Sequence, residues 1–217
     1  AKPSGTVVLP DIAFVKVNVD ELLIDNFNQT NLSLLARPSG NSLLVTMNSN
    51  EMNANLEWKK GQNGKEPELI AHISKLFIPS SAGDAAEKSK PVQIQGGWPA
   101  INAVIDDLTY GNMRLGKLEL VARNTPSAKG QLWKITKLNL SNSAAQLHSS
   151  GSWLKGFDGG NETNLLINTN INNLGGLLNR LDMKNLVRSG NGSIKGNLSW
   201  VGTPLGFNTQ SFDGELD

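Results

Sequence analysis

The chain has 217 residues, 38% of them hydrophobic and 18% charged, with a formal net charge of +1 and no cysteine. This balance excludes a disordered chain, disulfides and thiolate metal sites. It also gives no broad basic field of the kind that binds nucleic acid. No apolar run approaches the roughly 20 residues that span a bilayer, and no signal peptide is recognisable at the start.

The first predicted unit is a β repeat over residues 1–79. Val17 and Val19 alternate with polar neighbours, and the apolar positions change parity after Asp20–Glu21 before resuming at Leu32 and Leu34. Because strand side chains alternate between faces, such a change requires a bulge or a bend. The pattern predicts a bent hairpin with one apolar face.

A second hairpin and a loop follow. Residues 56–58 and 69–73 flank Asn63–Gly64, a pair that favours a tight turn. Residues 80–91 are small, charged and bounded by Pro91, which predicts a flexible loop.

The second repeat is predicted over residues 92–217 and begins with a copy of the first. Residues 19–37 align without a gap on residues 105–123, at an offset of 105 − 19 = 86, and the parity again changes at the acidic pair Asp106–Asp107. Repeats of this kind usually stack to form one continuous surface. The seven identical pairs are Asp20/Asp106, Leu22/Leu108, Asn26/Asn112, Leu32/Leu118, Leu34/Leu120, Ala36/Ala122 and Arg37/Arg123.

Further strands are predicted at 133–135, 138–140, 146–148, 165–167 and 194–200, and one stretch has a different period. Leucines at 174, 177, 178 and 181 recur at helical spacing, with Asn172 or Asn173 as the N-cap and Gly190 beyond the far end. We expect one short helix near 174–181 that plugs the end or side of the sheet; a movable lid is the alternative.

The chain offers no catalytic constellation. His72 and His148 are its only histidines, they fall on different predicted strands, and neither has a second ligand-type residue at metal spacing. The adjacent carboxylates of each acidic pair would point to opposite faces, so a solvated bend is expected there. Residues 190–196 resemble a phosphate loop only superficially and are interpreted as a hairpin turn. We therefore predict no enzyme, no metal and no cofactor.

An ordered series of short motifs resembles a known family. Trp133-x-Ile-x-x-Leu-x-Leu140, Gly151-Ser-Trp153, Asn173-Leu-Gly-Gly-Leu-Leu178, Gly190-Asn-Gly192 and Leu198-Ser-Trp-Val-Gly-Thr-Pro204 occur in an order similar to the C-terminal region of the YhdP family of AsmA-like proteins of Gram-negative bacteria. The resemblance is strongest from about Trp98 to Gly214.

The resemblance implies a fold and a function. The fold would be mainly β, an elongated, twisted and curved antiparallel sheet that forms an open groove from repeated β units. The function would be to carry phospholipid acyl chains along that groove between the inner and outer membranes. The chain would be a periplasmic piece of a longer inner-membrane-anchored protein whose anchor lies outside it, with neighbouring segments of that protein and other envelope proteins as partners.

Strand parity gives the candidate groove residues. From the residues alone, a closed core between two sheets explains the same pattern better, whereas the resemblance favours a groove. The candidates are Val17, Val19, Leu32, Leu34, Ile105, Leu118, Leu120, Leu138, Leu140, Leu165 and Ile167.

The five tryptophans support a second class of function. Carbohydrate-binding β-sandwiches also present tryptophan with Asn and Asp, so a sugar- or peptidoglycan-binding module is an alternative, as is a structural β-module of the cell envelope. Sugar binding requires several tryptophans exposed on one flat face. Lipid binding requires them at rims or buried.

Overall fold

The computed structural model describes residues 13–24, 27–62, 66–79, 99–157, 160–202, 204 and 213–216. Within them the chain is built almost entirely from strands. The elements are β1 (Val15–Ile24), β2 (Phe27–Ser39), β3 (Ser42–Asn48), β4 (Met52–Lys59), β5 (Glu68–Ile78), β6 (Ala100–Tyr110), β7 (Met113–Ser127), β8 (Gly130–Ser141), β9 (Ala145–Gly156), β10 (Asn161–Ile171), α2 (Leu174–Arg180), β11 (Gly192–Val201) and β12 (Asp213–Leu216).

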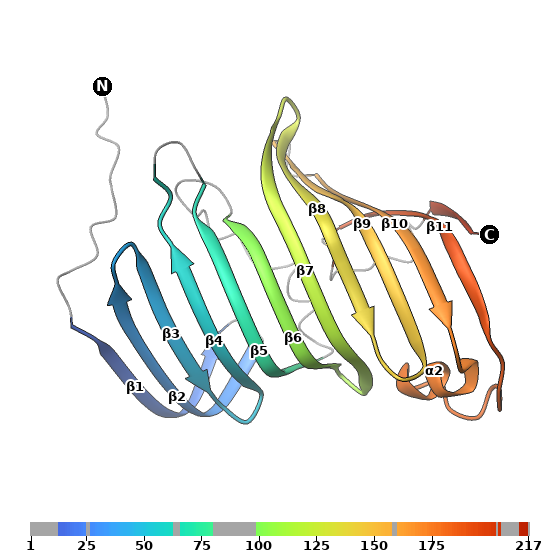
Figure 1. The fold of residues 1–217 in the computed structure, drawn as a ribbon, viewed down its shortest axis with the longest axis horizontal. Helices are drawn as coiled ribbons and strands as arrows, with labels where there is room; N and C mark the ends of the chain where they lie inside the picture. The colour runs from blue at the N-terminus through green and yellow to red at the C-terminus, as the bar shows by residue number, and fades with distance from the viewer. Residues whose placement is uncertain are drawn as a thin grey trace.

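All twelve strands belong to one sheet and lie in chain order from β1 to β12 (Figure 1). The expected mainly-β, curved open sheet with one short helix is confirmed. The expectation that the sheet is antiparallel throughout needs one correction. Every neighbouring pair is antiparallel except β5 and β6, which run parallel. A tight turn can join only antiparallel neighbours. Two parallel neighbours need a longer connection that runs back from the end of the first strand to the start of the second. The predicted flexible loop 80–91 lies in this connection, outside the described residues.

The two repeat copies are equivalent hairpins. Val17 pairs with Leu34 in the β1–β2 hairpin, and Ala103 pairs with Leu120 in the β6–β7 hairpin. Adding 86 to the first pair gives the second, so the copies share their register as well as their sequence.

The predicted parity change has a different structural origin in each copy. In β6 the register shifts between Ile105 and Leu108, and both of these side chains are buried while Asp106 and Asp107 are exposed. One extra residue in β6 therefore makes a bulge at the acidic pair.

In the first copy the register stays constant through the corresponding level. Gln29 and Leu32 of β2 are both buried, and between them lies the exposed Asn31 with a left-handed φ of 52°. Opposite, Asp20 and Glu21 are exposed. Each of the two strands therefore contains one additional residue at this point. The apolar positions change parity on both strands, and the pairing between the strands keeps its register.

Helix α2 begins where the sequence predicts and ends at Arg180, one residue before the predicted end. Asn173 is the N-cap and accepts a hydrogen bond from the Gly176 N–H, while Leu181 is the C-cap. The backbone N–H of Asn173 donates to the Ala144 carbonyl at 3.1 Å, and Arg180 donates to the Arg114 carbonyl. These contacts hold the helix at the lower ends of β7, β8 and β9 in Figure 1.

Two turn predictions have different outcomes. Strands β4 and β5 pair antiparallel with Leu56 opposite Ala71, which confirms the hairpin, although Asn63–Gly64 lies outside the described residues. The hairpin turn predicted at residues 190–196 is wrong. Gly190 and Asn191 belong to the return from α2, and β11 already begins at Gly192. The helix inserted between β10 and β11 takes the place of the tight turn.

Candidate functional site

One face of the sheet is apolar across eleven strands. Residues paired directly across neighbouring strands point to the same face, so the register traces rows of side chains from strand to strand. Three adjacent rows contain no charged residue, and Ser149 and Thr169 are their only polar members. The upper row is Pro38, Leu43, Trp58, Leu69, Ile101, Ala122, Ile135, Gly151, Leu165 and Leu198. The middle row is Val15, Ala36, Val45, Leu56, Ala71, Ala103, Leu120, Leu138, Ser149, Ile167 and Gly196. The lower row is Val17, Leu34, Met47, Ala54, Ile73, Ile105, Leu118, Leu140, Leu147, Thr169 and Ile194.

All eleven candidate groove residues lie on this apolar face. Leu165 is in the upper row, and Leu120, Leu138 and Ile167 are in the middle row. The other seven are in or beside the lower row on β1, β2, β6, β7 and β8. Five are members of that row, and the paired Val19 and Leu32 lie just below it. The five are Val17, Leu34, Ile105, Leu118 and Leu140. The structure therefore brings the candidates together as one surface.

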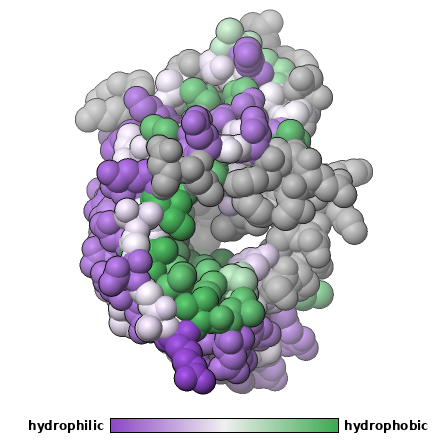
Figure 2. Space-filling view, turned by 90° about the vertical axis from the view of Figure 1, so that its right-hand side faces the viewer, coloured by the Kyte–Doolittle hydropathy of each residue, from purple (hydrophilic) through white to green (hydrophobic). Residues whose placement is uncertain are grey.

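The surface is hollowed. In the space-filling view, hydrophobic residues line the inside of a hollow, and hydrophilic residues cover the outer side of the curved wall (Figure 2). Strands in a sheet are spaced by about 4.8 Å, so ten intervals between β1 and β11 give a path on the order of 50 Å. The hollow thus follows the long direction of the sheet.

Sequence reasoning missed the middle of the surface. Strands β3, β4 and β5 supply Val45, Leu56 and Ala71 to it, and none of them was a candidate. The signal was present in the alternation of Leu43, Val45 and Met47. Ala54, Ala71 and Ile73 form a buried cluster with Ile105 and Leu108, which shows that the two repeats share one core.

The described residues contain no second sheet that could seal this face. The alternative of a closed core between two sheets therefore has no counterpart in the part of the chain that the structure describes. Packing within the face is nevertheless close in places. Ile135 and Leu165 flank Gly151, where a Cβ atom would collide with the Asn164 carbonyl oxygen.

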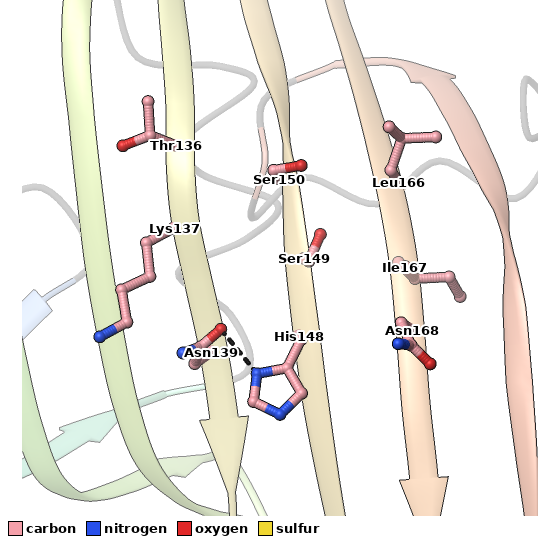
Figure 3. A pocket seen from close by; sticks show the side chains of 9 residues that line it. All are labelled: Thr136, Lys137, Asn139, His148, Ser149, Ser150, Leu166, Ile167 and Asn168. Carbon is pink, nitrogen blue, oxygen red and sulfur yellow. Dashed lines mark hydrogen bonds between the residues drawn. The ribbon is translucent and has the colours of Figure 1, made fainter.

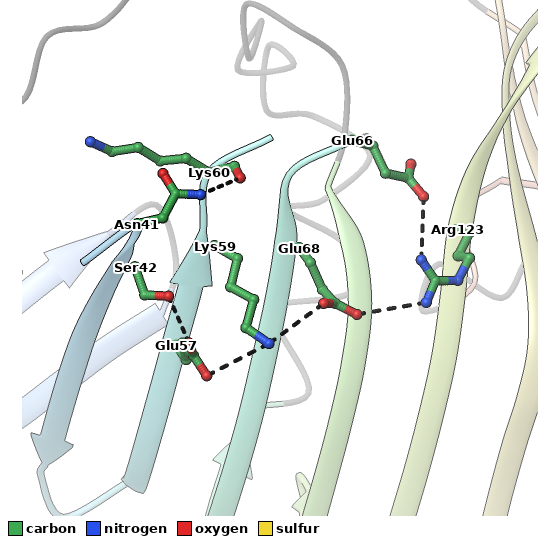
Figure 4. Close-up of polar contacts among 8 residues, drawn as sticks. All are labelled: Asn41, Ser42, Glu57, Lys59, Lys60, Glu66, Glu68 and Arg123. Atoms are coloured by element: carbon green, nitrogen blue, oxygen red, sulfur yellow. Dashed lines mark hydrogen bonds and ion pairs between the residues drawn. The ribbon is translucent and has the colours of Figure 1, made fainter. Parts of the chain in front are cut away.

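Ion pairs cross the opposite face (Figure 4). Arg123 on β7 lies 3.7 Å from Glu68 on β5 and 3.8 Å from Glu66, so its side chain reaches over β6. Glu68 in turn lies 3.9 Å from Lys59 on β4. A chain of opposite charges thus links strands β4 to β7 on the hydrophilic side.

A second set of charges lies on the same hydrophilic side. The Glu119 carboxylate lies between Lys137 and Lys117. Hydrogen bonds from these two ammonium groups hold the pKa of Glu119 below its usual value. Charged side chains therefore extend across the hydrophilic face from β4 to β8.

A depression of about 350 Å³ lies on this outer face over β8, β9 and β10 (Figure 3). The His148 ring lies 3.1 Å from the Asn139 carboxamide oxygen there, beside Lys137, Asn168 and Leu166. It presents no aromatic ring besides the imidazole. Its open shape and mixed lining make it a weaker ligand site than the apolar face.

The histidines do not form a metal site in the part of the chain that the structure describes. His72 Nε2 lies 3.1 Å from Asp106 Oδ2, which joins β5 to the acidic pair at the β6 bulge. No three side chains of His, Cys, Asp or Glu gather as metal ligands among the described residues.

The four described tryptophans all lie on the apolar face. Trp58 is in the upper row, and Trp133, Trp153 and Trp200 lie in the row just above it. Trp133 and Trp153 meet edge to face with ring centroids 5.8 Å apart, and Trp200 is 4% exposed. They do not form an exposed flat platform of the kind that binds sugar.

Comparison with known proteins gives one family. No helix among the described residues is long and apolar enough to cross a membrane. No curated protein and no solved structure matches the chain. The family model described as "YhdP protein" matches residues 2–217. Because this match covers nearly the whole sequence and agrees with the motif series, the chain belongs to the YhdP family.

Proposed function

We propose that this chain is part of an envelope protein that carries phospholipid acyl chains along its apolar face between the inner and outer membranes. The observation that supports this most directly is the set of three uncharged rows, two of which cross the sheet from β1 to β11 and the third from β2 to β11. Membership of the YhdP family fits an envelope protein of the AsmA-like type. The periplasm as its location, and a membrane anchor outside the chain, are parts of the same proposal.

The physical requirement for such a carrier is continuity. Moving a methylene group from an apolar environment into water costs roughly 0.8 kcal/mol, so each break in the path would hold a lipid back. Apolar side chains on every strand from β1 to β11 remove such breaks. The hydrophilic outer face, with Glu68 and Arg123, keeps the same wall in contact with water.

This transport makes and breaks no covalent bond. Selection would depend on the match between acyl chains and the apolar rows, and release would depend on the next segment offering an equally apolar surface. We therefore assign no catalytic residue. Lipid transfer explains the buried or half-buried tryptophans better than sugar binding does, since a sugar requires an accessible aromatic plane.

Three residues with equal exposure offer a direct test. Val17 on β1 and Ile194 on β11 lie on the apolar face, at its first and last strands. Leu35 lies on the outer face, and each of the three residues is 36% exposed. An aspartate at any of them remains in contact with water, so the fold should tolerate the change. On the apolar face, however, the carboxylate would meet acyl chains.

We would purify the chain and its Val17→Asp, Ile194→Asp and Leu35→Asp variants from bacterial cells, then identify retained lipid by native mass spectrometry. Wild type and Leu35→Asp should retain phospholipid, and the other two variants should lose most of it while their circular dichroism stays unchanged. Wild-type protein without phospholipid, or equal retention by all three variants, would contradict the proposal.

A further inference from the structure

Along the direction of strands β8 to β11, the two edges of the apolar face differ in chemistry. Above the upper row, Trp133 pairs with Trp153, and Trp153 pairs with Thr163, which pairs with Trp200. We call Trp133, Trp153, Thr163 and Trp200 the Trp row. It crosses β8 to β11 at the same level, one step from the rim of the sheet.

Polar side chains follow directly above the Trp row. Gln131, Lys155 and Asn161 are paired with one another and stand two residues beyond Trp133, Trp153 and Thr163, so they point to the same face. Lys155 is half-buried, and Asn161 Oδ1 is buried without a hydrogen-bond partner among the described residues. The row above the Trp row is therefore polar and contains one cation.

The opposite end of the same strands remains apolar. Below Leu140 and Leu147 come Ala145 and Ile171, which are paired and buried. The backbone N–H groups of Asn172 and Asn173 donate to Ala144, so the segment leading into α2 closes this end. In the described parts of β8 to β11, the apolar face carries no charged side chain at this end. Arg180 of α2 lies nearby, but its guanidinium donates to the Arg114 carbonyl and the Ser143 hydroxyl.

The order along the strands is therefore apolar rows, tryptophan, then a cation with amides. The same order occurs across a membrane interface, where tryptophan lies between hydrocarbon and headgroups. The length of the apolar part of the strand also agrees with the depth of hydrocarbon in one membrane leaflet. From Trp200 to Ile194 is 200 − 194 = 6 residues, or about 20 Å of strand, and the hydrocarbon of one leaflet is about 15 Å deep.

We infer that phospholipid binds here with its phosphate at Lys155 and its acyl chains pointing away from the Trp row, toward the lower row and α2. This inference rests on the proposed function. The Lys155 ammonium would donate to the phosphate, and the exposed Gln131 carboxamide beside it could contact the rest of the headgroup. The ligand class is a glycerophospholipid, held with one orientation as it moves along the face.

Site-directed fluorescence can measure this orientation, because the chain has no cysteine of its own. A bimane label would be placed at Gln131→Cys, in the polar row, or at Ile194→Cys, in the lower row. Each labelled protein is loaded with phospholipid carrying a nitroxide either on the headgroup or near the end of an acyl chain. The headgroup nitroxide should quench position 131 more strongly, and the chain-end nitroxide should quench position 194 more strongly.

The outcomes separate the two proposals. Quenching at neither position by either lipid would overturn lipid binding itself. Quenching at both positions with the reverse preference, or with none, would leave lipid binding in place and overturn the assigned orientation.

The role of Lys155 has its own test and a matched control. Lys134 lies on β8 next to the same row but on the outer face, because its neighbours Trp133 and Ile135 both lie on the apolar face. Phospholipid and diacylglycerol would compete for the protein. Loss of one charge-assisted hydrogen bond in Lys155→Gln should lower the preference for phospholipid about tenfold, and Lys134→Gln should leave it unchanged. Equal binding of the two lipids by wild type, or equal effects of the two variants, would overturn the phosphate contact.

Discussion

Glu51 holds Thr30 through two hydrogen bonds, since its carboxylate accepts from both the backbone N–H and the hydroxyl of Thr30 at 2.7 Å. Thr30 precedes Asn31, the left-handed residue at the bend of the first repeat. The turn between β3 and β4 thus fastens the bend in β2. Burial raises the pKa of Glu51, but the hydrogen bonds from Thr30 and Ser49 outweigh burial and leave this pKa below its usual value.

Glu51→Gln should lower the free energy of unfolding at neutral pH by about 1–2 kcal/mol, because a charged acceptor becomes a neutral one. A pKa that is depressed in the folded state gives stability that is present above the ordinary glutamate pKa and lost as pH falls through the lower folded value. The difference between wild type and variant in urea unfolding should therefore shrink in acid. An equal difference at neutral and acidic pH would contradict this assignment.

Gly151→Ala should be strongly destabilising. A Cβ atom at this position would collide with the Asn164 carbonyl oxygen and lie 2.9 Å from Leu165 Cα, so strands β9 and β10 would have to separate. We expect a loss of about 2–4 kcal/mol in chemical unfolding. Gly192→Ala is the control, because a Cβ atom there meets nothing within 4 Å. Similar losses in both variants would show that the close approach of β9 and β10 is not the cause.

Asn173→Ala should fray helix α2. Its side-chain oxygen accepts from the Gly176 N–H at 2.8 Å, and removal of such a cap typically costs about 1 kcal/mol. Hydrogen exchange of the amides in 174–181 should accelerate while that of β8 and β9 stays unchanged. Asn172→Ala changes an exposed neighbour outside the cap and should have little effect. Faster exchange throughout the sheet would instead make α2 part of the global core.

Arg123→Gln should have a small, salt-dependent effect. The Arg123 side chain is 57% exposed and its guanidinium lies 3.7 Å from the Glu68 carboxylate. Exposed ion pairs typically contribute about 0.2–1 kcal/mol. A double-mutant cycle with Glu68→Gln at low ionic strength should give a coupling in this range, which 1 M salt should largely remove. A coupling that resists salt would indicate that the pair is shielded from solvent.

The sequence by itself determined the repeat, the strands and the face to which each apolar residue belongs. Val17, Leu34, Ile105 and Leu118 all fell on one face because strand alternation is a local property with a fixed period of two. Helix α2 was equally predictable, since the leucine spacing and the Asn173 cap lie within one short segment. The parity change at Asp106–Asp107 was visible for the same reason.

Only the tertiary structure decided how these pieces combine. The parallel pairing of β5 with β6 joins the two repeats into one surface, and no local pattern encodes a partner separated by a long connection. The Trp row depends on the same kind of information, because Trp133, Trp153 and Trp200 are distant in sequence and share a level only through the register of four strands. Local periodicity fixes which face a residue occupies, whereas the pairing between strands fixes its neighbours on that face.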